Sequence, residues 1–158
     1  EVVLVDVSEH PIDDLKKTAQ VLQRQKEKAH PKKQLVVDKN TGTIICTAVG
    51  QGRRHDFHLY KNSKVRIMDK VQILADSGYQ GIKKLHHNAA LPKKNTKKCP
   101  LTKQDKKENH HISSERVLVE NIIRRVKIFR VMAEKYRNRR KRFTLRWNLI
   151  AAIINYEL

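Results

Sequence analysis

Residues 71–81 read VQILADSGYQG, an apolar run that ends in Asp76 and is followed by a polar turn with two glycines. An apolar run of this length, bounded by turn residues, predicts a buried β-strand over 71–76. The chain opens on the same pattern, because residues 2–7 form a β-branched apolar run that carries Asp6 near its end. Side chains at the ends of neighbouring strands converge at one edge of a sheet, so we expect Asp6 and Asp76 to lie close together.

Shorter apolar segments add strands to the expected sheet. Residues 35–38 and 43–49 are predicted strands joined by a loop of hairpin length that contains Gly42. Residues 91–92 are expected to form a short edge segment, because a proline cannot donate to a central ladder. We also expect a short helix within residues 15–28 and a Lys-rich loop over residues 93–109.

Two helices are predicted in the C-terminal third. Apolar residues at 118, 119, 122, 123, 126, 129 and 132 recur with a helical period, which predicts a long helix that begins at Ser113 or Ser114. Residues 147–156 are apolar nearly all round and predict a final buried helix, with Trp147 in the core. The fold class expected over residues 1–158 is a single α/β domain, with a mixed five-stranded sheet flanked by helices.

The charge of the chain points to an anionic partner. Thirty-five Lys and Arg oppose 16 Asp and Glu, which leaves a formal net charge of +19. This excess destabilises a compact protein by self-repulsion, so we expect nucleic acid as the partner, with an anionic membrane surface as the alternative. No segment approaches the ~18 apolar residues that span a bilayer. Cys46 and Cys99 show no metal-ligand spacing, and we expect both as free thiols in a reducing cytosol.

A third acid, Glu120, lies on the predicted long helix between two cations. At ~100° per residue, Arg116, Glu120 and Lys127 fall within about 40° of one another around the helix. Three carboxylates can hold two divalent ions ~3.5–4 Å apart for phosphodiester chemistry. Arg116 and Lys127 would then grip the nucleic-acid strand beside Glu120.

Simpler interpretations remain open for each of these residues. An Asp at the end of a strand is often a turn former or a helix cap, and Arg116 with Glu120 is also an ordinary i,i+4 pair. No P-loop, glycine-rich phosphate cradle or Ser/His/Asp pattern occurs in the sequence, so a kinase, an NTPase and a serine hydrolase are unsupported.

Several of these motifs together resemble the DDE transposases of bacterial insertion sequences. The resemblance covers nearly the whole chain, and its most specific parts are the D-x-G-Y-x-G turn at 76–81 and the R-x3-E-x6-K stripe at 116–127. It also includes the RRHD motif at 53–56, Pro92-Lys93-Lys94 and the YRNR motif at 136–139. It implies a ribonuclease-H-like fold, in which Asp6, Asp76 and Glu120 are the catalytic residues and bind Mg²⁺ or Mn²⁺ at a two-metal site.

The resemblance further implies cleavage and strand transfer at transposon ends, with transposon-end and target DNA as partners. We expect a cytoplasmic, nucleoid-associated protein that assembles as a homodimer, and a fragment that lacks an N-terminal DNA-recognition domain. Ser113 stands where the family usually has a tyrosine, and residues 21–28 replace a basic stretch. A nuclease of the same fold and an inactive DNA-binding remnant therefore remain as alternatives.

Basic side chains outside the acid triad are candidates for contact with phosphates. Such contacts position DNA without reading its sequence. His55 with Asp56 could lie near the acids and orient a phosphate or water, and a capped helix start is the simpler interpretation of this pair. The predicted DNA-binding residues are Arg54, His55, Lys93, Lys94, Arg116, Lys127, Arg139 and Arg140.

Overall fold

Five strands form one mixed sheet in the computed structural model, which describes residues 1–9, 31–52, 54–96, 100–134 and 142–158. The strands are β1 (Val2–Glu9), β2 (Lys32–Asp38), β3 (Ile44–Gly50), β4 (Gln72–Ala75) and β5 (Ala89–Ala90). They lie in the order β3-β2-β1-β4-β5. β2 runs antiparallel to both β1 and β3, whereas β4 is parallel to β1 and β5 is parallel to β4. This confirms the expected mixed five-stranded sheet of a ribonuclease-H-like α/β fold.

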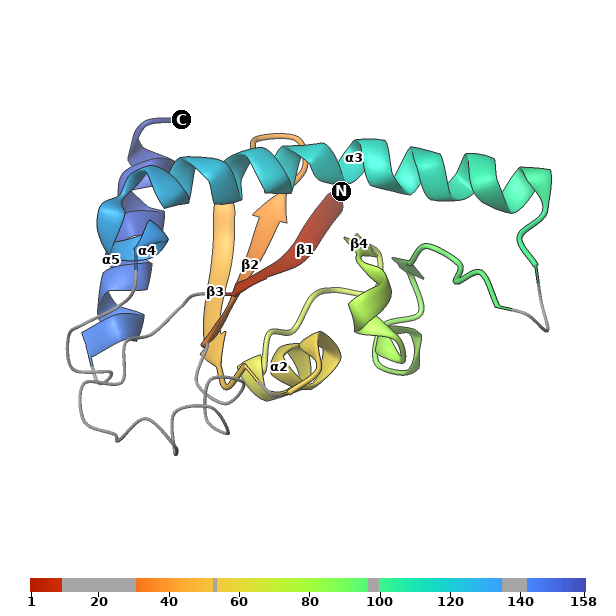
Figure 1. Ribbon diagram of the computed structural model, residues 1–158, viewed down its shortest axis with the longest axis horizontal. Coiled ribbons are helices and arrows are strands. Elements are labelled where there is room, and N and C mark those ends of the chain that lie inside the picture. The colour runs from red at the N-terminus through yellow and green to blue at the C-terminus, as the bar shows by residue number, and fades with distance from the viewer. Residues whose placement is uncertain (10–30, 53, 97–99, 135–141) are drawn as a thin grey trace, which may run out of the picture.

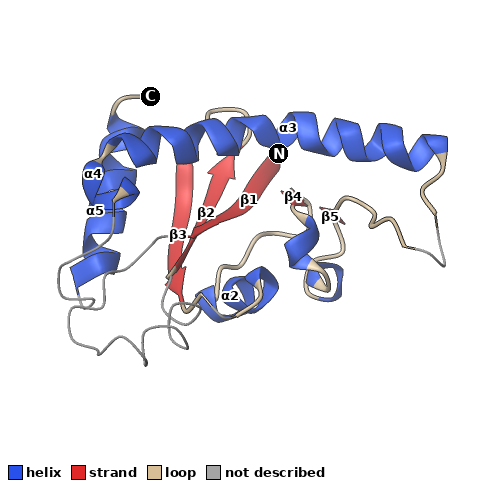
Figure 2. Cartoon of the chain, in the orientation of Figure 1, coloured by secondary structure: helices blue, strands red, loops and turns tan. Residues whose placement is uncertain are grey.

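Helices cover both sides of the sheet (Figure 1, Figure 2). They are α2 (Asp56–Ser63), α3 (Lys103–Ile128), α4 (Arg130–Ala133) and α5 (Phe143–Tyr156), with two 3₁₀ turns, η1 (Ser77–Tyr79) and η2 (Ile82–Lys84). Figure 1 shows α3 passing along the whole sheet and continuing beyond β4 and β5. No helix in the described ranges is both long and apolar enough to cross a bilayer.

The alternation of side chains along each strand divides the core in two. On one face, Leu4, Leu35 and Leu74 pack against residues of α3, α4 and α5 that include Trp147. On the other, Val5 and Ile73 belong to a cluster with side chains of α2, η1 and η2. Trp147 is buried, as the sequence predicted.

The long helix begins ten residues before the predicted start. Thr102 caps α3: its hydroxyl accepts from the Asp105 backbone N–H, and the Asp105 carboxylate accepts in return from the Thr102 N–H. The predicted loop over 93–109 is therefore wrong for its last seven residues. The first turns of α3 lack an apolar stripe because they extend past the sheet, so hydrophobic periodicity could not detect them.

The last helix is amphipathic rather than buried all round. Leu145 and Leu149 on α5 are exposed, while Trp147, Ile150 and Ile154 face the core. Asn155 ties α5 to β3, because its side-chain amide accepts from the Ile44 backbone N–H at 2.8 Å and donates to the Ile44 carbonyl at 2.9 Å. Asn155 thus pairs both backbone groups of Ile44, on the strand at the edge of the sheet.

Smaller predictions had mixed outcomes. The edge strand is Ala89–Ala90, two residues before the predicted 91–92, because so short a parallel strand has no periodic signal. Cys46 lies half-buried in β3 as a free thiol. The predicted helix within 15–28 and Cys99 lie outside the described residues, as do Arg139 and Arg140.

Candidate active site

Asp6 and Asp76 lie side by side at one end of the sheet. β1 and β4 are parallel, and their last paired residues are Val5 and Ala75. The next residue on each strand is the acid, and both acids share the face of Leu4 and Leu74, which packs against α3. The predicted convergence of these two carboxylates is therefore present in the structure.

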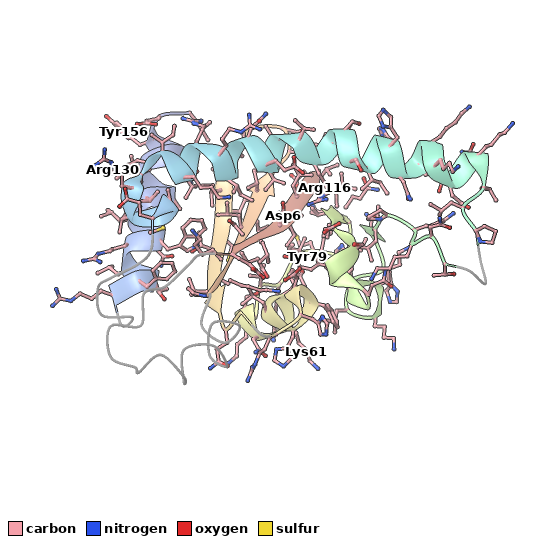
Figure 3. The ribbon with its side chains drawn as sticks, in the orientation of Figure 1. Asp6, Lys61, Tyr79, Arg116, Arg130 and Tyr156 are labelled. Atoms are coloured by element: carbon pink, nitrogen blue, oxygen red, sulfur yellow. The ribbon has the colours of Figure 1, made fainter. Side chains whose placement is uncertain are left out.

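Arg116 of α3 bridges the two acids. Its guanidinium lies 3.1 Å from Oδ2 of Asp6 and 3.5 Å from Oδ1 of Asp76, and Figure 3 shows the side chain directed from α3 toward Asp6. Side-chain exposure is 12% for Arg116 and 15% for Asp6, but 44% for Asp76. The pair thus opens to solvent on the Asp76 side, and Nε of Arg116 is buried with no hydrogen-bond partner among the described residues.

Backbone donors fix the orientation of both carboxylates. Oδ1 of Asp6 accepts from the Val7 N–H at 2.9 Å, and Oδ1 of Asp76 accepts from the Ser77 N–H at 2.6 Å. Burial raises the pKa of Asp6, although Arg116 and the Val7 N–H oppose the shift. The site therefore holds a carboxylate whose charge is costly without a cation beside it.

Tyr79 of η1 lies in the core cluster on the face of the sheet opposite α3. Its ring is buried and meets Tyr60 edge-on, with the ring centroids 6.3 Å apart. The hydroxyl has no hydrogen-bond partner among the described residues. Burial raises the pKa of Tyr79 far above its usual range, and the charges of Asp6 and Asp56 raise it further. The hydroxyl is therefore a neutral donor near the acids.

Each glycine of the D-x-G-Y-x-G turn occupies its position for a different physical reason. Gly81 adopts φ +99°, in the left-handed region that favours glycine, and it begins η2. Gly78 has a close neighbour instead: a Cβ there would lie 2.4 Å from Oδ2 of Asp56. The turn that carries Asp76 is therefore in direct contact with the start of α2.

Glu120 lies one turn beyond Arg116 on α3 and is exposed. Among the residues that the structure describes, no group of three His, Cys, Asp or Glu side chains is placed to hold a metal ion. The structure thus brings Asp6 and Asp76 together, and Arg116 rather than Glu120 contacts them. Glu120 as the third ligand stays a prediction.

The predicted DNA-binding residues within the described ranges come from several elements. Lys93 forms ion pairs with Asp105 and Glu108 of α3, which raise its pKa, so its charge is already compensated. Lys94 is exposed. Arg54 and His55 precede α2, and His55 is its N-cap residue but makes no side-chain capping bond.

Lys127 marks a second basic region on α3. It lies ~16 Å along the helix from Arg116, at 1.5 Å per residue, so the two cations would contact different phosphates. Burial, and next the charge of Lys127, lower the pKa of Lys33, a buried lysine of β2 that donates to the Met132 carbonyl at 3.3 Å. Lys33 also lies 5.1 Å from the centre of the Trp147 ring.

Sequence reasoning assigned no role to Tyr79 or Lys33, and it considered Asp56 only together with His55, as a pair that could orient a phosphate or water. Tyr79 and Asp56 fall inside the motifs at 76–81 and 53–56, so a signal was present in both cases. The sequence does not show how close the two motifs lie in the folded protein. For Lys33 nothing in the pattern distinguishes a buried lysine from its neighbour Lys32.

The residues at this end of the sheet fit a divalent cation. Carboxylate oxygens are the hard ligands that Mg²⁺ and Mn²⁺ favour. The Arg116 guanidinium between Asp6 and Asp76 shows that this pair accepts positive charge within hydrogen-bonding distance. Asp76 is open enough to solvent for an ion to reach it.

Comparison with known proteins agrees with this geometry. The family model described as DDE superfamily endonuclease matches residues 5–155. A protein described as a probable transposase for insertion sequence element IS702, from Microchaete diplosiphon, is 44% identical over 157 residues. The alignment covers 99% of this chain and 57% of that relative, so the chain spans just over half of the relative's length. No solved structure matches the chain. Because the family model covers nearly the whole chain, the chain belongs to the DDE superfamily endonucleases.

Proposed function

We propose that this chain is the catalytic part of a DNA transposase that cleaves transposon ends and joins them to target DNA. The observation that supports this most is the pair of strand-end carboxylates, Asp6 and Asp76, bridged by a cation from α3. The likeness to a probable transposase over 99% of the chain supports the same function. We propose that a separate DNA-recognition domain recognises the transposon ends. The relative is long enough to contain such a domain, since the alignment covers only 57% of it.

Asp6, Asp76 and Glu120 are the proposed ligands for Mg²⁺ or Mn²⁺. Bound divalent ions would supply the Lewis acidity that activates the attacking water or hydroxyl and stabilises the leaving oxygen. The chain's own part is to hold the carboxylates in place through the Val7 and Ser77 N–H groups. Glu120 would complete the set from α3, where it is exposed one turn beyond Arg116.

Arg116 exchanges partners in this proposal. Without metal it forms ion pairs with both acids. With a cation held by the two acids, the Arg116 guanidinium would be available to bind a phosphate of the DNA bidentately, and its Nε–H, which has no partner among the described residues, would be a further donor. Lys127 contacts the same strand farther along α3. Arg54, His55, Lys93, Lys94, Arg139 and Arg140 are candidates for contact with the rest of the DNA.

Strand transfer requires the cleaved 3′-hydroxyl to stay bound while a second duplex enters. A homodimer that brings two ends together would meet this need, and a protein acting on the chromosome would be associated with the nucleoid. Catalysis then rests on positioning and charge stabilisation, as in other phosphoryl transfers.

The test supplies the protein with Mg²⁺ or Mn²⁺, a labelled DNA end with a 3′-hydroxyl, and unrelated plasmid. We expect covalent joining of the label to the plasmid, lost in Asp6→Asn, Asp76→Asn and Glu120→Gln. Charge reversal at Arg139 and Arg140 should reduce joining more than cleavage. Nicking without any joined product would assign the nuclease alternative, and DNA binding without chemistry would assign the inactive remnant; either result overturns the proposal.

A further inference from the structure

Asp56, at the start of α2, lies against the turn that carries Asp76. A Cβ on Gly78 would meet three atoms of Asp56, with Oδ2 at 2.4 Å, Cγ at 3.3 Å and Cβ at 3.5 Å. Only a residue without a side chain lets this carboxylate come so close. No positive φ constrains Gly78, so the contact with Asp56 is what requires glycine at this position.

Lys32 of β2 holds the Asp56 carboxylate. Its Nζ donates to Oδ1 of Asp56 at 2.8 Å and lies 3.7 Å from Glu9 of β1. The side chains of Lys32 and Asp56 are 14% and 24% exposed, so water screens this pair only in part. One oxygen of Asp56 is therefore fixed by the sheet while the other touches the Asp76 turn.

Asp56 connects three elements that lie apart in the sequence: it begins α2, pairs with Lys32 of β2 and contacts Gly78 of η1. α2 and η1 both pack on the face of the sheet opposite α3, with Tyr60 and Tyr79 in the same core cluster. Asp56 itself is paired with Lys32, on that same face, and not with Arg116. Its place is therefore behind the Asp76 turn rather than among the groups that face α3.

We propose that Asp56 is a positioning residue: held by Lys32, it contacts Gly78 and fixes the turn on which Asp76 is presented. The inference rests on the proposed role of Asp76 as a metal ligand. A ligand on a short 3₁₀ turn needs support from behind, because η1 has only three residues and few hydrogen bonds of its own. Partners that orient a metal ligand usually matter by about 10- to 100-fold in activity or metal affinity.

A double-mutant cycle between Asp56 and Gly78 tests the contact. We expect Asp56→Ala to lower kcat for metal-dependent DNA cleavage about 10- to 100-fold and to weaken Mn²⁺ binding, with little change in KM for DNA. Gly78→Ala should have a similar effect, because the new Cβ displaces the Asp56 carboxylate. In the double variant the carboxylate is gone and the remaining Asp56 Cβ lies at an ordinary 3.5 Å. Gly78→Ala should therefore add almost nothing to Asp56→Ala.

Three further variants separate positioning from folding. Asp56→Asn keeps the shape and an acceptor for Lys32, so it should restore most of the activity lost in Asp56→Ala. Lys32→Met should reproduce the loss, because it releases the carboxylate. Asp69→Asn is the matched control, since its side chain is 88% exposed and pairs with His86 rather than with a residue of the turn, and it should leave kcat unchanged. All variants are compared by circular dichroism to verify that they fold.

Two results would overturn the inference: unchanged kcat and Mn²⁺ affinity in Asp56→Ala, or losses from Asp56→Ala and Gly78→Ala that add in the double variant. A wild-type protein without metal-dependent cleavage would instead refute the proposed function. In that case the contact is judged by NMR without metal. The Ser77 and Gly78 amide resonances should shift in Asp56→Ala but not in Asp69→Asn, and unchanged resonances would refute the contact as well.

Discussion

At the scale of single residues, Asp6 has an environment that favours its neutral form. It is mostly buried, Asp76 lies on the adjacent strand, and burial outweighs the help of Arg116, so its pKa is raised. The charged form of Asp6 therefore costs stability in the protein. This is the pattern expected of a metal ligand, whose charge becomes favourable only when the ion arrives.

Asp6→Asn should therefore remove catalysis without weakening the fold. A raised pKa means that the folded protein holds the Asp6 proton more tightly than the unfolded chain does. The free energy of unfolding thus falls as the pH rises from 3.8, the ordinary Asp value, through the folded value, and the cost is complete at neutral pH. Thermal unfolding at pH 7 should show a midpoint for Asp6→Asn at or above that of the wild type. A clear drop, absent from Asp69→Asn, would contradict this.

The lowered pKa of Lys33 predicts a second pH dependence of the free energy of unfolding. Burial, and next the charge of Lys127, lower its pKa from 10.5 to about 8. Between these two values the unfolded chain binds the proton and the folded protein does not, so the free energy of unfolding rises with pH. Below pH 8 the penalty is complete and amounts to about 3 kcal/mol at most.

Lys33→Met removes this titration while keeping a long apolar side chain. It should be more stable than the wild type at pH 7, and the difference should shrink as the pH approaches 10. Urea unfolding at several pH values measures the difference, with the exposed Lys106→Met as a control that shows no such trend. A difference that stays constant between pH 7 and pH 10 would show that Lys33 titrates normally.

At the scale of elements, α5 protects the edge of the sheet through one side chain. Asn155 satisfies both backbone groups of Ile44, the first residue of β3. Asn155→Ala should lower the free energy of unfolding by about 1–3 kcal/mol, the usual cost of leaving such groups unpaired. Chemical denaturation is the measurement, and Asn121→Ala, at an exposed position of α3, is the control. Equal stability of the two variants would mean that water replaces the Asn155 contacts at no cost.

The strands were easier to predict from the sequence than the helix ends. The β1 and β4 strands stand out because their residues are apolar and bounded by turns, and a shared end for Asp6 and Asp76 follows from parallel pairing. The start of α3 could not be found from periodicity, since its first turns have no core to face. Its capping box uses Asp105 where the common signature has Glu or Gln.

The sequence predicted that Asp6 and Asp76 lie together, but not which side chains contact them. Arg116 was expected to grip DNA, whereas the structure shows it on Asp6 and Asp76. That contact depends on how α3 crosses the sheet, which no local pattern encodes. The same holds for Asp56, whose partners Lys32 and Gly78 lie 24 and 22 positions away in the chain.

At the scale of the whole molecule, the net charge of +19 predicts how the protein binds DNA. Each neutralised phosphate contributes about −0.9 to the slope of log affinity against log salt, so a footprint of six contacts gives about −5. Filter binding or fluorescence anisotropy over a salt series measures this slope. Glu120→Gln should bind as tightly as the wild type or slightly more tightly, because it deletes a negative charge. An affinity independent of salt would remove DNA as the partner.

The central claim is that Asp6 and Asp76 hold divalent ions at the end of the sheet. The most direct measurement is anomalous diffraction from a crystal of the protein soaked in Mn²⁺. We predict a peak between the two carboxylates, with Arg116 moved away from them and Glu120 rotated toward the ion. The same peak should be missing in Asp76→Asn. Mn²⁺ bound only elsewhere, with the Arg116 bridge to both acids intact, would contradict the account.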